Sequence, residues 1–219
     1  MKPRSTPLLF AFALAVLLPP GPGAAEPWVP PGGKLEFTIA RDGSEIGRQV
    51  LTFARDGTRL TVDTRVEIAV KRFFVTVHRF ERTARSVWRD GLIESYTAST
   101  DNNGKKTSLS MTARGDALEI RANGQSRRVA RTMKIPEFWN IDVLSEKSVV
   151  NTVTGEIDEI VVSPPEKTVL EAGGKKVPAL RYRVTGKTAR HLWYDEKGGL
   201  LQIVRTARDG SKIVTRRRF

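Results

Sequence analysis

The residues of this sequence with the most evident capacity for chemistry lie in the segment Arg-His-Leu-Trp-Tyr-Asp at positions 190–195. In an extended strand, His191 and Trp193 share one face because successive side chains point to opposite sides. An imidazole beside an aromatic ring could act as a base or contact a ligand in a concave surface. Alternatively, Trp193 packs in the core, Asp195 opens a turn and His191 is a partly exposed neighbour. We favour this alternative because the histidine has no identified partner.

Two further groups of residues could contact a ligand. The amide of Asn140, beside Trp139, could hydrogen-bond a ligand or satisfy loop backbone groups instead. A basic cluster without an acidic residue is formed by Arg127, Arg128, Arg131 and Lys134. Arginine forks bind phosphate bidentately, although such runs are usually a solvated face. The candidate ligand contacts are therefore Trp139, Asn140, His191, Trp193, Arg127, Arg128 and Arg131.

The sequence offers little for catalysis or for a metal. It contains no cysteine and only two histidines, His78 and His191. A zinc site would need carboxylates from distant strands, and the nucleophile-elbow and metalloprotease motifs are absent. We therefore predict no catalytic residue, no metal site and no cofactor, and the sequence favours a protein that is not an enzyme.

In the segments that must position these residues, apolar and polar residues alternate with a period of two. The clearest case is residues 59–71, where one parity carries Leu60, Val62, Val66, Ile68 and Val70. This pattern predicts a long half-buried strand. Shorter alternating runs precede and follow it, separated by Asp-Gly and Asn-Gly pairs that suit tight turns. Because successive strands lie close together in sequence, the economical topology is an antiparallel meander.

One segment interrupts the strands and has the spacing of a short helix. Pro136 suits a first helical position, and Phe138, Ile141 and Leu144 form an apolar stripe. A helix across a curved sheet is a usual way to cover its open side. We therefore predict a mainly β fold: a strongly bent antiparallel meander sheet, as a half-barrel or barrel-like clamshell, with one short covering helix.

The first 25 residues have the order of a secretory signal peptide. Lys2 and Arg4 precede eleven apolar residues at 8–18, and small residues lead up to Ala25. Eleven residues rise about 16 Å as a helix, which is less than the ~30 Å hydrocarbon core of a membrane. We expect cleavage after Ala25, leaving one β-rich domain at residues 26–219 in the periplasm, without a transmembrane segment.

The excess of basic over acidic residues indicates which kinds of molecule the protein could bind. The formal charge is +13, and removal of Lys2 and Arg4 would leave +11. A positive surface favours anionic partners, although it could also serve solubility alone. An exported chain rarely meets nucleic acid, so we expect none. Lipid phosphates, lipopolysaccharide or anionic glycans are the expected counterparts.

Several short motifs occur together along the expected mature chain. They are Arg-Asp-Gly and Glu-Ile-Gly within 37–47, Trp-Arg-Asp-Gly at 88–91, Asp-Asn-Asn-Gly at 101–104, Phe-Trp-Asn at 138–140, Thr-Gly-Glu at 154–156 and Leu-Trp-Tyr-Asp at 192–195. As a set they resemble an uncharacterised bacterial family of exported proteins, a domain of unknown function. That family is similar to a second one thought to adopt a half-barrel like those of periplasmic lipoprotein carriers. The resemblance implies an exported β-rich protein and brings no established catalytic residues.

Three functions remain open from the sequence. We expect an exported, non-enzymatic protein that binds an apolar or anionic amphipathic, lipid-like ligand in a concave sheet. The first alternative is a structural or interaction protein of the envelope that docks a protein partner or an anionic glycan. The second is a hydrolase that uses His191 with Asp195 or another carboxylate. An apolar interior cavity would favour the ligand carrier, and a filled core would favour the interaction protein.

Overall fold

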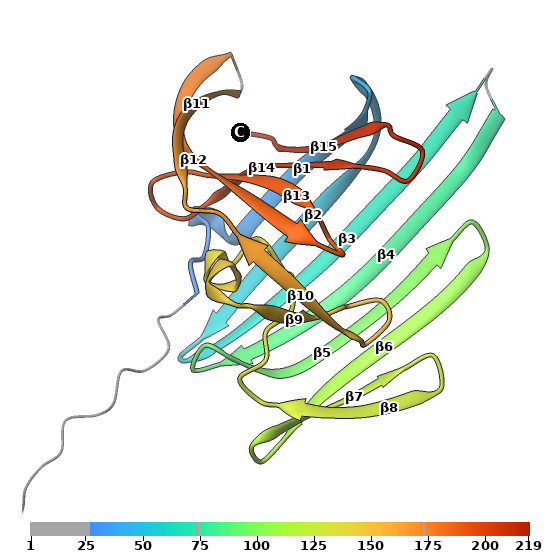
Figure 1. The fold of residues 1–219 in the computed structure, drawn as a ribbon, viewed down its shortest axis with the longest axis vertical. Coiled ribbons are helices and arrows are strands. Elements are labelled where there is room, and N and C mark those ends of the chain that lie inside the picture. Colours follow the sequence, from blue (N-terminus) through green and yellow to red (C-terminus); the bar gives the residue numbers. More distant parts are fainter. Residues whose placement is uncertain (1–26, 73–74, 173) are drawn as a thin grey trace, which may run out of the picture.

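The computed structural model describes residues 27–72, 75–172 and 174–219, and the expected signal peptide lies outside them. Fifteen strands in these residues form an antiparallel sheet (Figure 1). The strands are β1 (Lys34–Arg41), β2 (Ser44–Asp56), β3 (Arg59–Arg72), β4 (Val75–Arg89), β5 (Leu92–Asn102), β6 (Lys105–Arg114), β7 (Ala117–Ala122), β8 (Gln125–Ala130), β9 (Ser148–Val150), β10 (Ile157–Val162), β11 (Glu166–Ala172), β12 (Lys175–Gly186), β13 (Arg190–Tyr194), β14 (Leu200–Thr206) and β15 (Lys212–Arg217). Two short 3-10 helices are η1 (Pro31–Gly33) and η2 (Ile141–Ser145).

Alternation of side chains sets which face of each strand is buried. In β3, Leu60 and Val62 are buried, whereas Arg65 on the other parity is exposed. Towards the far end of the same strand, Val66 and Ile68 are only half-buried although they share the inward parity. The long strand therefore belongs to the core at one end and lines open space at the other.

The strand order confirms the predicted meander and shows how the chain returns on itself. Neighbouring strands run β8-β7-β6-β5-β4-β3-β2-β1-β15-β14-β13-β12-β10-β9, and β11 pairs with β12. The single long-range step joins β1 to β15, with Ile39 opposite Thr215. The sheet is strongly bent and remains open, as the arrangement of the blue-to-green and orange-to-red strands in Figure 1 illustrates.

The Asp-Gly and Asn-Gly pairs form the hairpin turns that their composition predicts. Asp90 and Gly91 have φ angles of 52° and 73°, and Asn103 and Gly104 have φ angles of 57° and 86°. Positive φ at both central residues is the geometry whose twist matches two antiparallel strands. These turns fix the register on both sides of β5.

The covering segment differs from the predicted helix. Its regular part is η2, which begins at Ile141 rather than at Pro136, and the Asn140 side chain accepts a hydrogen bond of 3.1 Å from the backbone N–H of Asp142. Phe138 and Trp139 are adjacent in sequence and both buried. On a helix, the side chains of neighbouring residues point about 100° apart, so one helix face would not bury both Phe138 and Trp139 fully. An irregular segment can direct both side chains into the core.

Two strands were not predicted. The alternation that identifies half-buried strands is missing from β8, whose residues are exposed apart from half-buried Val129, because β8 forms one end of the strand order. The three-residue β9 is too short to show a period. The basic residues Arg127 and Arg128 thus lie on an edge strand, where charged side chains discourage pairing with another chain.

Gly47 lies on β2, opposite Ile39 of β1 and Ile68 of β3, where the close approach of the backbones leaves no room for a side chain. The β1–β2 register shifts at this point, and a Cβ atom at Gly47 would lie 2.0 Å from the carbonyl oxygen of Glu67. We expect Gly47→Ala to reduce the free energy of unfolding by about 1–3 kcal/mol, because the strand backbones must separate. Urea denaturation measures this loss. The exposed Glu45→Ala on the same strand should change stability little, and equal losses in the two variants would contradict the explanation.

Within the described residues, no helix combines the length and apolar character needed to cross a membrane.

Candidate ligand site in the concavity of the sheet

A cavity of about 250 Å³ lies on the concave side of the sheet, against the segment that covers it. Pro136, Glu137, Phe138 and Trp139 contribute to its wall from the covering segment. The sheet contributes apolar side chains from strands of both halves of the chain. These are Ile39, Leu51, Val66, Ile68, Phe80, Ala84, Leu200, Ile203 and Ile213. The cavity therefore has the mostly apolar lining that is typical of small-molecule sites.

A hydrogen-bonded group of polar side chains lies along the β4–β5 side of this cavity. The Arg82 guanidinium donates to the hydroxyl of Tyr96 at 2.8 Å and to the carbonyl oxygen of Thr152 at 3.1 Å. Arg82, Tyr96 and Thr152 all border the cavity. These bonds fix the arginine and join β4 and β5 to the loop that follows β9.

Glu137 is a carboxyl group enclosed by protein at the cavity wall. Its Oε2 accepts hydrogen bonds of 2.9 Å from the Ser86 hydroxyl and 2.9 Å from the Trp139 indole N–H. Burial raises the pKa of Glu137, and these two hydrogen bonds and the charge of Arg82 offset only part of that effect. Enclosure by protein thus disfavours the ionised form of this carboxyl group.

Arg190 and Arg205 supply two further cations. The Arg190 guanidinium lies 4.5 Å from the centre of the Phe138 ring, and its Nε donates to the carbonyl oxygen of Thr188 at 2.8 Å. Burial and the charge of Arg205 lower the pKa of Arg190 to about 10, so Arg190 stays protonated at neutral pH. Arg205 reaches solvent at the edge of the cavity. The concavity therefore has a positive electrostatic character.

Tyr194 holds the covering segment against the sheet. Its buried hydroxyl donates to the carbonyl oxygen of Phe138 at 2.8 Å. We expect Tyr194→Phe to lower the free energy of unfolding by about 1–3 kcal/mol, because a buried carbonyl loses its donor. Tyr182→Phe is the matched control, since this neighbouring ring stacks edge-on against Tyr194 and its hydroxyl has no hydrogen bond within the described residues. Thermal unfolding of both variants measures the difference, and an equal loss would refute the anchoring role.

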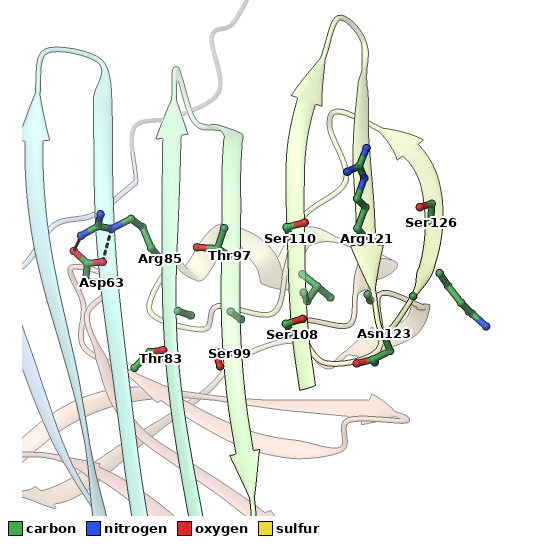
Figure 2. Close-up of a pocket in the computed structure, with 16 residues that line it drawn as sticks. Asp63, Thr83, Arg85, Thr97, Ser99, Ser108, Ser110, Arg121, Asn123 and Ser126 are labelled. Carbon is green, nitrogen blue, oxygen red and sulfur yellow. Dashed lines mark hydrogen bonds and ion pairs between the residues drawn. The ribbon is translucent and has the colours of Figure 1, made fainter. Parts of the chain in front are cut away.

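A larger and shallower hollow of about 720 Å³ lies on the outer face of the same sheet (Figure 2). Its floor is a row of cross-strand partners in which Arg85, Thr97, Ser110 and Arg121 follow one another across β4–β7. Arg85 is neutralised by Asp63 at 2.7 Å. This hollow is open and rich in hydroxyl groups, whereas the smaller cavity combines apolar walls with Arg82, Arg190 and Arg205, which form no ion pair within the described part of the chain. The smaller cavity is therefore the better candidate site.

The structure brings only one of the predicted contacts to this cavity, namely Trp139. Asn140 is buried and caps η2. His191 and Trp193 occupy the strand parity opposite to buried Leu192 and Tyr194, with their ring centres 6.1 Å apart. Burial and the charges of Arg183 and Arg181 lower the pKa of His191, and Glu166 opposes them.

The basic residues Arg127 and Arg128 lie on edge strand β8, away from the cavity. Arg131 follows this strand, and its guanidinium donates to the carbonyl oxygen of Gly115 at 3.3 Å.

Sequence reasoning missed Arg82, Glu137, Arg190 and Arg205. A signal for some of them exists, because Arg82 shares the parity of Phe80 and Ala84, and Arg190 shares the parity of Leu192. An arginine at one of the alternate strand positions that otherwise carry apolar residues points its side chain toward the core. The position of Glu137 depends on the irregular covering segment, for which no periodicity exists.

The open, bent sheet with an interior cavity places this chain among β-barrel-like proteins. Residues 37–218 match the family described as "Domain of unknown function (DUF6134)", and the chain belongs to this family. Its fold is similar to the crystal structure of a beta-barrel-like protein of domain of unknown function DUF1849 from Brucella abortus, with a TM-score of 0.55 and 8% identity over 84% of this chain and 94% of that chain. These findings confirm the expected resemblance to a β-rich domain of unknown function, and at this identity the structural likeness concerns the fold alone. No curated protein matches the chain.

Proposed function

We propose that this protein is an exported, non-enzymatic binding protein that holds an apolar or anionic amphipathic, lipid-like ligand in the concavity of its sheet. The observation that carries the proposal is the cavity between the sheet and the covering segment. Its apolar side chains offer contacts to a hydrocarbon chain, and Arg82, Arg190 and Arg205 offer cations at its wall. A mostly apolar lining with a few convergent polar groups is typical of such sites.

The half-buried ends of the long strands support this function. Val66 and Ile68 on β3 and Phe80 on β4 border the cavity and are not fully covered by the rest of the chain. In a core that served stability alone, these apolar side chains would gain more from full burial. Their partial exposure is explained if a ligand completes the packing on this face.

The arrangement gives the hydrolase alternative no support. His191 lies on the strand parity that faces away from the core, and no carboxylate forms an ion pair with it in the described residues. A general base must lie within hydrogen-bond reach of the group it serves.

One observation favours the first alternative, a structural or interaction protein of the envelope. The outer hollow in Figure 2 presents the hydroxyl groups of Thr97, Ser99, Ser108 and Ser110 together with Arg121. Such a surface could hydrogen-bond an anionic glycan or a protein partner. Arg121→Glu would then weaken capture of the partner from envelope extracts, whereas it should leave ligand binding in the concavity unchanged.

Native mass spectrometry tests the leading proposal. The protein is purified gently from its own source, and lipids are extracted from a second portion of the same sample. We expect a defined additional mass in the native spectrum and the matching lipid in the extract. A clean mass of the polypeptide alone, together with no displacement of a fluorescent fatty acid, would overturn the proposal.

A further inference from the structure

Two arginines face each other across neighbouring strands at one end of the cavity. Leu192 pairs with Ile203 between β13 and β14, and extending this register by two positions sets Arg190 opposite Arg205. The charge of Arg205 acts on Arg190, which agrees with this placement. Leu192 is buried and Ile203 packs against the main core. Because side chains alternate along a strand, Arg190 and Arg205 project on this same inward side.

No acidic side chain neutralises this pair within the described part of the chain. Neither arginine forms an ion pair there, and the pKa of Arg190 is shifted by burial and by Arg205 and Tyr194 rather than by a carboxylate. Two arginines on the outer face have a different environment: Arg85 lies 2.7 Å from Asp63 and Arg48 lies 2.9 Å from Glu67. The pair thus differs from Arg85 and Arg48, whose charges are balanced by neighbouring carboxylates.

This arrangement opposes folding of the empty protein. Like charges directly opposite each other on one face of a sheet are destabilising. Partial enclosure by protein adds a desolvation cost, which lowers the pKa values of both Arg190 and Arg205. Local departures from favourable patterns are expected at functional sites. An anion bound between the guanidinium groups would remove the repulsion.

The pair stands where the cavity meets the surface. Arg190 and Arg205 border the 250 Å³ cavity and also an adjoining hollow of about 220 Å³, which reaches Arg183 and His191. A group bound here is within reach of solvent, while a chain attached to it can extend between Leu51, Val66 and Phe80. Cations at the mouth and apolar walls behind them match a polar head and an apolar tail.

The size of the cavity restricts the tail. Its volume of about 250 Å³ lies below the range of about 300–1,000 Å³ that is usual for sites of drug-sized ligands. One short hydrocarbon chain fits this space better than the two chains of a phospholipid.

We propose that Arg190 and Arg205 together bind the oxyanion head group, a carboxylate or phosphate monoester, of a single-chain amphipath whose tail occupies the cavity. This inference rests on the proposed function and specifies the ligand class and its orientation. Two planar forks can each donate two hydrogen bonds to such an oxyanion. The interaction neutralises the pair and directs the tail toward β3 and β4.

Isothermal titration calorimetry with decanoate, decyl phosphate, decanol and inorganic phosphate tests the inference. We expect both decyl anions to bind at least about tenfold more tightly than decanol or inorganic phosphate, and the preferred anion identifies the head group. Arg205→Gln should reduce anion affinity by about tenfold to hundredfold, the range for losing a hydrogen bond to a charged group, and leave decanol affinity unchanged. Arg208→Gln, in the exposed turn after β14, is the matched control and should bind like the wild-type protein.

A second variant separates binding from folding. Arg190→Lys keeps the charge but loses the fork, so we expect intermediate anion affinity with normal circular dichroism. If decanol binds as tightly as the decyl anions and Arg205→Gln changes nothing, the head-group inference is overturned while the ligand cavity stands. If inorganic phosphate binds as tightly as decyl phosphate, the amphipath is refuted. If no decyl compound binds, the proposed function itself fails and the inference fails with it.

Discussion

Replacing Trp139 by alanine is expected to lower the free energy of unfolding by about 3–5 kcal/mol, the range for truncating a buried aromatic side chain. The Trp139 ring is 2% exposed and packs edge-on against Phe53 and Trp88, at centroid distances of 5.2 and 5.8 Å. These partners come from β2 and β4, so Trp139 fastens the covering segment to the middle of the sheet. Its loss would also remove the indole donor to Glu137.

Urea denaturation followed by circular dichroism measures this effect. Trp193→Ala is the control, because Trp193 is only partly buried and packs against the small cluster around Leu170 and Leu201. We expect a smaller loss of about 1 kcal/mol in the control. Equal losses would show that the covering segment does not depend on Trp139, and the cavity would then lack a fixed wall.

Glu137→Gln is expected to make the protein more stable than the wild type at neutral and alkaline pH. Burial raises the pKa of Glu137, so the folded state binds this proton more tightly than the unfolded state does. Wild-type stability therefore falls as pH rises from the ordinary glutamate value toward the raised one, by up to about 1.4 kcal/mol per pH unit. Glutamine can still accept the hydrogen bonds from Ser86 and Trp139 but carries no ionisable group.

Unfolding free energies between about pH 4 and pH 9 test this linkage. The two proteins should have similar stability at the acidic end. As the pH rises above the ordinary glutamate pKa, the variant should become progressively more stable than the wild type. Glu171→Gln, on the exposed surface of β11, should follow the wild-type profile throughout. Parallel profiles for wild type and Glu137→Gln would mean that Glu137 is ionised without cost in the folded protein.

Sequence periodicity was sufficient to predict the sheet, because its physical basis is local. The parity of Leu60 and Val62 defines the buried face of β3, and the positive φ angles of Asp90 and Gly91 follow from their residue types. The pairing of β1 with β15 carries no local signal, since the partners Ile39 and Thr215 are far apart in sequence. The edge strand β8 also escaped prediction, because a strand exposed on both faces shows no hydrophobic period.

The candidate site was less accessible to sequence reasoning than the fold. Aromatic and imidazole groups attracted attention to His191 and Trp193, yet the cavity is bordered instead by their neighbour Arg190. One residue of register decides which face a side chain occupies. Arg205 became significant only through its position opposite Arg190, which depends on the pairing of β13 and β14.

The measurement that tests the ligand-binding account most directly is titration of the protein with a fluorescent fatty acid, compared with a variant whose cavity is filled. Ile68 borders the cavity, and its neighbour Ala69 lies on the exposed face of the same strand. The account predicts saturable binding to the wild type and to Ala69→Trp, and loss of that binding in Ile68→Trp with folding retained. Equal binding by Ile68→Trp and Ala69→Trp would place the ligand elsewhere and contradict a site in the concavity.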